Sequence, residues 1–239
     1  MPATLPEAVL AAAGDRRAGA TQIARQAIHG LLLVAGDCAL LDAGATALLA
    51  GQPAMAPIWH VARAARAADP VAALSELGRR LDTEAGQAVA GAVAWLRALG
   101  GPVRTASSSS LVDQVLDRLG ADAAGNPARG EVAVVGADAV GPAVFLNGAG
   151  TRELVARVPA IVVATSIKLV PEHVLDHLAA PGFERIPLAA VAAVALGDEV
   201  VDPAEAGRRA ARAWSSTAGT TPRPGTTSSW WASGGRSRP

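Results

Sequence analysis

Residues 131–151 read EVAVVGADAVGPAVFLNGAGT, and this stretch decides the fold expected for the second half of the chain. It opens with an apolar run, residues 132–135, which is typical of a strand buried on both faces of a parallel sheet. Asp138 follows, and glycine and proline then predict a loop. Thr151 is the expected N-cap of a short helix. This order of features predicts a ligand crevice at the carboxyl edge of an open α/β sheet.

Helical patterns dominate the chain before this stretch. Ile23, Ala27 and Leu31 recur at the helical period. Asp69 and Pro70 together predict an N-cap and the first helical position, and two helices are expected after them, split near residues 82–83. We therefore predict an α/β protein: a helical domain over residues 1–101, and a reduced Rossmann-like domain over residues 102–213 with a parallel sheet and helices on both faces. Residues 214–239 are rich in Ser, Thr, Gly and Pro and predict a disordered tail.

The composition narrows the classes of partner. The chain has 239 residues, of which 51% are hydrophobic, enough for one large domain or two small ones. Twenty-one basic residues balance 21 acidic ones, so no charge excess favours nucleic acid or an anionic membrane. We expect neither as a partner.

The location expected for the chain is the cytoplasm. Cys38 is the only cysteine, so no intramolecular disulfide forms and a reducing compartment is expected. The N-terminus lacks the basic segment of a secretory signal. Asp37 and Asp42 interrupt the most apolar region, residues 28–49, which argues against a membrane span. We expect Cys38 to be a buried apolar residue.

Three motifs carry a resemblance to a known family. The motifs are GADAV at residues 136–140, NGAGT at 147–151 and VPAIVVATSIK at 158–168. They resemble the initiation factor 2B alpha/beta/delta family. This family includes regulatory subunits of the eukaryotic nucleotide-exchange factor and isomerases of methylthioribose 1-phosphate and ribose 1,5-bisphosphate. The residues that fall on the family pattern are Asp138, Asn147, Gly150, Thr151, Pro159 and Lys168. Gly148 stands where the family's lysine is usual.

The chain also departs from the family pattern. On the match, Ser107 replaces the catalytic cysteine of the isomerases, and Gln52 replaces an arginine expected to bind the substrate's phosphate. Glutamine lacks the charged, planar fork of arginine. Roughly fifty residues of the usual second half are missing, so the sheet should be smaller than in the family.

The resemblance implies an initiation factor 2B-like, homo-oligomeric protein that binds a small phosphorylated metabolite and needs no cofactor. The departures favour a non-catalytic or regulatory module that binds a phosphorylated sugar or nucleotide. The alternative is an aldose–ketose sugar-phosphate isomerase that uses Asp138, with Ser107 at the cysteine position.

Asp138 is the central candidate residue. A carboxylate at the carboxyl end of a strand, beside backbone amides, is placed to act as a general acid or base on a sugar hydroxyl. The other interpretation is that Asp138 hydrogen-bonds the backbone of its own loop.

The remaining candidates are ligand-binding residues. Lys168 is the only lysine, and it either neutralises a phosphate or lies in solvent. The serines at 107–110 either bind an anion or provide redundant N-caps. For Gln52 the alternative is a helix start in which Pro53 and Met55 only begin and pack the helix. The full set of predicted ligand-binding residues is Gln52, Ser108, Ser109, Asn147, Gly150, Thr151 and Lys168.

No metal site is predicted. His173 and His177 are four residues apart on an expected helix and share a face, as zinc-binding pairs do. The sequence supplies no convincing third ligand near them, so we expect no bound metal.

Overall fold

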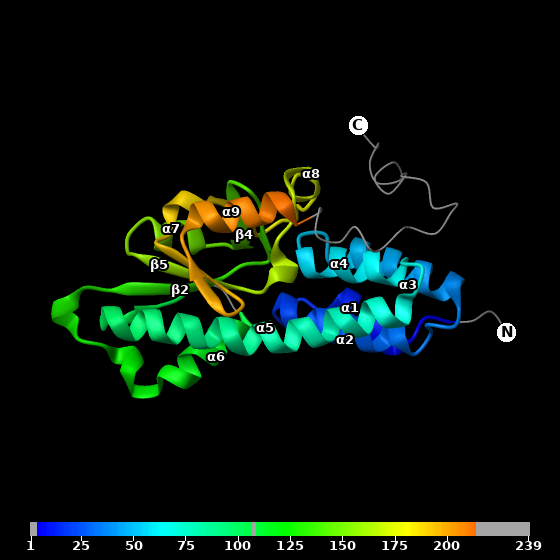
Figure 1. Ribbon diagram of the computed structural model, residues 1–239, viewed down its shortest axis with the longest axis horizontal. Helices are drawn as coiled ribbons and strands as arrows, with labels where there is room; N and C mark the ends of the chain where they lie inside the picture. Colours follow the sequence, from blue (N-terminus) through cyan, green and yellow to red (C-terminus); the bar gives the residue numbers. More distant parts are fainter. Residues whose placement is uncertain (1–3, 107–108, 214–239) are drawn as a thin grey trace.

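The computed structural model describes residues 4–106 and 109–213. Five helices come first and strands begin at residue 103 (Figure 1). The predicted tail and the serines at positions 107 and 108 lie outside the described residues. The helices of the first part are α1 (Glu7–Gly14), α2 (Ala20–Leu32), α3 (Cys38–Gly51), α4 (Ala56–Ala65) and α5 (Pro70–Leu99).

Local signals explain where these helices begin. The Asp37 carboxylate accepts hydrogen bonds from two amides in the first turn of α3. The Asp69 carboxylate caps α5 in the same way, with Pro70 in the first turn as predicted. Cys38, the first residue of α3, is exposed, so the prediction that it is a buried residue was wrong.

Helix α5 is continuous over 30 residues, so the predicted division near residue 82 was wrong. Its buried stripe runs through Leu77, Leu81 and Ala85 without a break. The N-terminal part of α5 packs against α2 and α4, and the C-terminal part packs against the sheet (Figure 1). The helix ends at Gly100, whose φ of 68° is the left-handed conformation common after a helix.

The main sheet has five strands in the order β1-β2-β5-β7-β8. The first four strands are parallel, and β8 pairs antiparallel with β7. All five residues of β2 are buried, as the apolar run at 132–135 predicted. These strands are β1 (Val103–Arg104), β2 (Val132–Gly136), β5 (Ala160–Ala164), β7 (Ala193–Leu196) and β8 (Glu199–Val201).

Helices cover both faces of this sheet, which confirms the predicted fold class. Val134 and Val163 pack with residues of α5 and of α6 (Ser110–Leu119). Val135 and Val162 face the opposite way and pack with residues of α7 (Thr151–Val155) and α9 (Pro203–Arg212). Successive strand residues point to opposite faces, so a short apolar run fills two separate cores.

A second, antiparallel sheet occupies the region that the sequence predicted to be a loop. It consists of β3 (Ala139–Val140), β4 (Val144–Gly148) and β6 (Phe183–Pro187) in the order β3-β4-β6. Phe145 and Leu146 are buried, and their burial is the reason that this glycine-punctuated segment forms a strand. The helix α8 (Glu172–Leu175) lies beside this sheet (Figure 1).

Among the described residues, no helix has both the length and the apolar character that a bilayer crossing requires. The division into domains at residues 101 and 213 stays a prediction.

Candidate functional site

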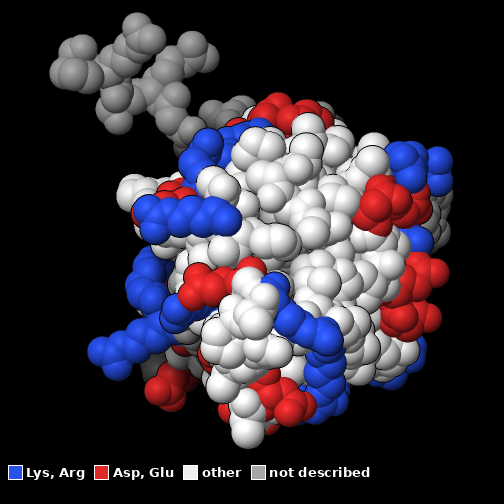
Figure 2. All heavy atoms as spheres, turned by 90° about the vertical axis from the view of Figure 1, so that its left-hand side faces the viewer, with Lys and Arg blue, Asp and Glu red and all other residues white. Residues whose placement is uncertain are grey.

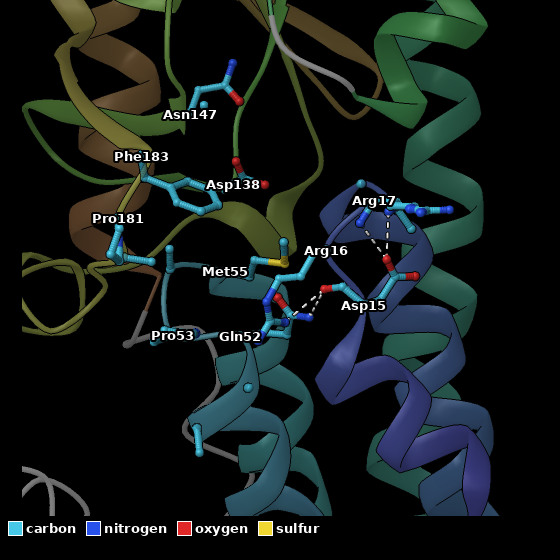
Figure 3. Close-up of a pocket in the computed structure, with 17 residues that line it drawn as sticks. Asp15, Arg16, Arg17, Gln52, Pro53, Met55, Asp138, Asn147, Pro181 and Phe183 are labelled. Carbon is cyan, nitrogen blue, oxygen red and sulfur yellow. Dashed lines mark hydrogen bonds between the residues drawn. The ribbon is translucent and has the colours of Figure 1, made fainter.

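A cleft of about 440 Å³ lies beyond the carboxyl end of β2, between the helical part and the two sheets. Figure 3 shows that the cleft is built from the α1–α2 linker, the α3–α4 linker, the β2–β3 turn, β4 and the segment that enters β6. Residues 15–19, 50–55, 138, 147, 148, 180, 181 and 183 line it. Three of the predicted site residues therefore meet in one cleft: Gln52, Asp138 and Asn147.

Asp138 is held in the cleft wall by its backbone. Its N–H donates to the Leu146 carbonyl at 2.8 Å, and its carbonyl accepts from the Ala56 N–H at 2.9 Å. In the described part of the chain, the Asp138 carboxylate accepts no hydrogen bond. It therefore does not tie down its own loop, and it is available to a ligand.

Burial changes the acidity of Asp138. Desolvation raises the pKa of its carboxyl to about 6, and the positive charge of Lys168 opposes this rise. A pKa near 6 lets a carboxyl group both give and take a proton close to neutral pH.

Asn147 lies on β4 and connects the cleft to the start of α7. Its side-chain Nδ2 donates to Thr151 Oγ1 at 3.0 Å, and the Thr151 hydroxyl donates to the Gly148 carbonyl at 2.8 Å. Thr151 is fully buried and is the first residue of α7, with Gly150 as the N-cap, one position earlier than predicted. Thr151 and Gly150 do not line the cleft.

Gln52 connects the end of α3 to the end of α1 and to the α1–α2 linker. The residue is 5% exposed, and its Nε2 donates to the carbonyl oxygens of Ala12 at 2.9 Å and Asp15 at 2.6 Å. These contacts occupy the N–H groups, and in the described part of the chain the side-chain oxygen accepts no hydrogen bond. An acceptor oxygen suits a hydroxyl group better than a phosphate.

The α1–α2 linker contributes charged residues that the sequence analysis did not identify. Arg16 lines the cleft, and its guanidinium donates to the Asp15 carbonyl at 3.0 Å, the same oxygen that Gln52 contacts. The Asp15 carboxylate accepts from the amides of Arg17 and Ala18, which lower the pKa of this carboxyl. The available signal was Gly-Asp-Arg-Arg directly ahead of an amphipathic helix, where α2 begins after Gly19.

Lys168 is buried in the protein interior. It ends the 3-10 helix η3 (Ser166–Lys168) after β5 and is 2% exposed, so the alternative that it lies in solvent was wrong. Burial lowers the pKa of its ammonium to about 8, and the Asp138 carboxylate opposes this change. Lys168 does not line the cleft.

The predicted serines are only partly placed. Ser107 and Ser108 lie outside the described residues. Ser109 is the N-cap of α6 and is 8% exposed, and its side chain packs against the end of β2 at Gly136. A Cβ atom at Gly136 would lie 2.5 Å from Ser109 Oγ, so this close packing requires glycine. Ser109 does not line the cleft.

The opposite wall of the cleft is apolar. Met55, Pro181 and Phe183 face the space into which Asp138 points (Figure 3). The cleft thus combines a charged rim at Arg16, a carboxylate at Asp138 and a hydrophobic surface, the mixture typical of small-molecule sites.

No metal-binding cluster is found among the described residues: no group of three or more His, Cys, Asp or Glu side chains is arranged to hold an ion. The His177 ring nitrogen Nδ1 lies 2.7 Å from the backbone carbonyl of His173, one turn earlier.

A scan of protein-family models and a search of curated proteins give no match to this chain. Solved structures do match. The chain is similar to the translation initiation factor eIF-2B of Pyrococcus horikoshii OT3, with 18% identity and a TM-score of 0.64 over 86% of this chain and 99% of that one.

Two further matches have different biochemical descriptions. eIF2B beta of Chaetomium thermophilum is 14% identical, with a TM-score of 0.57 over 84% of this chain and 87% of that one. The 5-methylthioribose 1-phosphate isomerase of Pyrococcus horikoshii OT3 is 15% identical, with a TM-score of 0.51 over 88% of this chain and 87% of that one. At these identities the likeness concerns the fold. The chain therefore has the fold of eIF2B subunits and of 5-methylthioribose 1-phosphate isomerase, which is the family that its motifs resemble.

Proposed function

We propose that the chain is an eIF2B-like, non-catalytic or regulatory module that binds a phosphorylated sugar or nucleotide in the Asp138 cleft. The observation that carries the proposal is the Asp138 carboxylate, which faces the cleft and accepts no hydrogen bond in the described part of the chain. A polar group in this position gains a partner when a ligand enters.

The charged rim suits the phosphate group. Arg16 and Arg17 both line the cleft, and guanidinium groups bind phosphate through two parallel hydrogen bonds. Helix α2 has 13 residues and begins on the same rim at Gly19, so its dipole also favours an anion.

The inner part of the cleft suits a sugar. Asp138 and the side-chain oxygen of Gln52 are hydrogen-bond acceptors, which ribose hydroxyls satisfy. The apolar wall of Met55 and Phe183 covers either the face of a sugar or a nucleobase. Both ligand classes fit a cleft of about 440 Å³.

The second candidate is an aldose–ketose isomerase acting on ribose 1,5-bisphosphate or methylthioribose 1-phosphate. The pKa of about 6 at Asp138 favours it, because isomerisation moves a proton near neutral pH. Ser107 at the cysteine position argues against it, since a serine hydroxyl is a far weaker acid than a thiol.

Thermal unfolding with added ligands tests binding. We expect ribose 5-phosphate, ribose 1,5-bisphosphate, methylthioribose 1-phosphate or AMP to raise the Tm, since a ligand at 100 times its Kd stabilises by about 2.7 kcal/mol. Arg16→Ala should remove the shift. Arg79→Ala, on the exposed side of α5, is the matched control and should keep it. If none of these compounds raises the Tm, both functions are contradicted.

Turnover assays with the same compounds separate the two functions. Binding without isomerisation supports the module. Isomerisation by the wild type that is lost in Asp138→Asn supports the enzyme and overturns the first proposal.

We also propose that the chain forms a homodimer and acts in the cytoplasm. Figure 2 shows a broad face without charged side chains, surrounded by arginines and acidic residues, at the end of the molecule that lies on the left in Figure 1. The centres of protein interfaces are depleted of charged residues. One matched structure is a tetrameric eIF2B-beta2-delta2 complex from C. thermophilum. Light scattering after gel filtration should give twice the mass of one chain.

The proposed location in the cytoplasm rests on Cys38, because its exposed thiol favours a reducing compartment.

A further inference from the structure

The positive charges that line the Asp138 cleft lie on one side of it. Among the described lining residues, Arg16 and Arg17 are the basic ones, and both belong to the α1–α2 linker. Figure 3 shows them on the opposite side of the cleft from Pro181 and Phe183. A ligand that spans the cleft therefore meets cationic side chains at one end only.

The far end of the cleft has a fixed apolar surface. Met55, Pro181 and Phe183 line it, and Met55 is 8% exposed. Phe183 is partly buried and packs against the helical core to which Met55 belongs. These contacts hold the aromatic ring and the thioether in place, so the surface exists before a ligand arrives.

Strand pairing leaves one side of the Phe183 ring uncovered by β4. Phe183 is the first residue of β6, and its partner in the antiparallel ladder is Gly148, which also lines the cleft. The side chains of directly opposite residues in antiparallel strands are neighbours on the same face. Because glycine has no side chain, β4 contributes none that would cover the ring, and a ligand group can pack there.

The backbone of the apolar end offers an anion little. Pro181 has no N–H group. The Phe183 N–H donates to the Ala180 carbonyl at 3.3 Å, and the Met55 N–H donates to the Gln52 carbonyl at 3.4 Å. A phosphate placed against these residues would lose water without gaining their hydrogen bonds, which is costly for a charged group.

Asp138 adds electrostatic repulsion to this cost. Its side chain lies between the two ends of the cleft in the view of Figure 3. The pKa of its carboxyl is about 6, so the group is ionised at pH 8. Like charges repel more strongly in a partly buried site than in water. The two phosphates of a pentose bisphosphate lie at opposite ends of the sugar, so one of them would have to lie away from the arginines.

We propose that the cleft selects ligands with a single phosphate and an apolar or aromatic group at the opposite end of the sugar, and that Phe183 and Met55 determine this specificity. The inference rests on the proposed function and narrows it. Nucleoside monophosphates and sugar phosphates with an apolar substituent are favoured, and pentose bisphosphates are disfavoured.

Three compounds that share a 5-phosphate test the proposal. Ribose 5-phosphate, ribose 1,5-bisphosphate and AMP differ in the group on C1, which is a hydroxyl, a phosphate or adenine. Titration calorimetry at pH 8 should give AMP a Kd about tenfold below that of ribose 5-phosphate, because the base buries apolar surface. The bisphosphate should bind about tenfold more weakly than ribose 5-phosphate, because its second phosphate is desolvated without a cation.

A second pair of compounds tests an aliphatic group at the same end. Methylthioribose 1-phosphate differs from ribose 1-phosphate by a methylthio group in place of the 5-hydroxyl. Tighter binding caused by adenine or by the methylthio group supports the proposal, and the pair that shows it identifies the group that the apolar end accepts. The proposal is overturned if neither group tightens binding, or if the bisphosphate binds as tightly as ribose 5-phosphate.

Phe183→Arg tests the role of the apolar surface directly. The substitution places a cation at this end, so it should tighten the binding of ribose 1,5-bisphosphate, weaken that of AMP and reverse their order. Val71→Arg is the matched control, since it adds the same charge at a position of α5 that is 50% exposed, and it should leave both Kd values unchanged. A folded Phe183→Arg that keeps the wild-type order would contradict the assignment of specificity to Phe183. If this variant does not fold, the wild-type series still decides the proposal.

The wild-type series also separates this inference from the proposed function. If none of the five compounds binds, the proposed function fails and the inference fails with it. If the bisphosphate binds best, the proposed function stands and only the specificity inferred from the apolar end is overturned.

Discussion

The backbone carbonyl of Asp138 accepts a hydrogen bond from the Ala56 N–H at 2.9 Å, so the first turn of α4 is joined directly to the carboxyl end of β2. This bond connects the helical part of the chain to the sheet part at the cleft itself. The partial positive charge at the start of α4 also lies next to Asp138. The two walls of the cleft therefore share a fixed geometry.

We predict that Gln52→Leu destabilises the fold by about 1–3 kcal/mol, because buried carbonyl oxygens of residues 12–15 lose their donor. Chemical denaturation by urea measures this change. Gln22→Leu is the control, since Gln22 is exposed on α2, and it should change the stability by less than about 0.5 kcal/mol. Equal effects of the two substitutions would show that the hydrogen bonds of Gln52 contribute nothing to the stability of the fold.

A second prediction compares the stability effects of alanine substitutions at Gly51 and Gly86. A Cβ atom at Gly51 would lie 2.3 Å from the Ala13 carbonyl oxygen, whereas one at Gly86 would meet nothing within 4 Å. Gly51→Ala should therefore cost about 1–3 kcal/mol through overpacking. Gly86→Ala, in the middle of α5, should stabilise by about 0.5–1 kcal/mol through helix propensity. Thermal melts of the two variants should shift in opposite directions.

His60 should make the fold sensitive to acid. Burial lowers its pKa to about 4 from 6.5, so between these values the unfolded chain binds more protons than the folded one. The stabilisation from neutral His60 is complete above pH 6.5 and is lost as the pH falls through 4. By pH 4.5 the loss amounts to roughly 2–3 kcal/mol.

The raised pKa of Asp138 acts in the opposite direction between pH 3.8 and 6, where stability falls as the pH rises. The two groups partly cancel in the wild type, so the comparison must be made between variants. Urea unfolding of His60→Asn at pH 7 and pH 4.5 should show that its deficit relative to the wild type shrinks on acidification. Trp59→Phe, a packing control, should show the same deficit at both pH values.

A double-mutant cycle measures the energetic coupling between Asp138 and Lys168. Burial raises the pKa of the Asp138 carboxyl, so its ionised form lowers the stability at pH 7, and Asp138→Asn should stabilise the fold by about 1–3 kcal/mol. In a Lys168→Met background the stabilisation by Asp138→Asn should be larger, because the positive charge that favours the ionised carboxyl is then gone. Additive effects in the double variant would indicate that the two residues do not interact.

The parallel sheet was predictable because buried strands leave a strong local signal. The runs at 132–135 and 161–164 contain only apolar residues, a pattern typical of buried strands, and both are strands of the main sheet. The second sheet was not predictable, because Gly141 and Pro142 are loop signals, and only the burial of Phe145 against distant residues makes the segment that follows them a strand.

The candidate site was predictable only in part, for a similar reason. Asp138 and Asn147 follow recognisable strand and turn patterns. Arg16 lies in a short charged linker. The position of this linker depends on how α1 packs against α3 and on the hydrogen bond from Gln52 to the Asp15 carbonyl. Contacts between residues far apart in the sequence carry that information, and a local pattern does not contain it.

Helix α5 also limits how the molecule can move. A 30-residue helix is about 45 Å long, and the same helix packs against α2 and α4 at one end and the sheet at the other. Hinge closure of two lobes around a ligand requires a flexible connection between them, and an unbroken helix resists bending. A ligand must therefore enter through small movements of the linkers at residues 15–19 and 180–182. The width of the cleft should be the same in the free and in the ligand-bound protein.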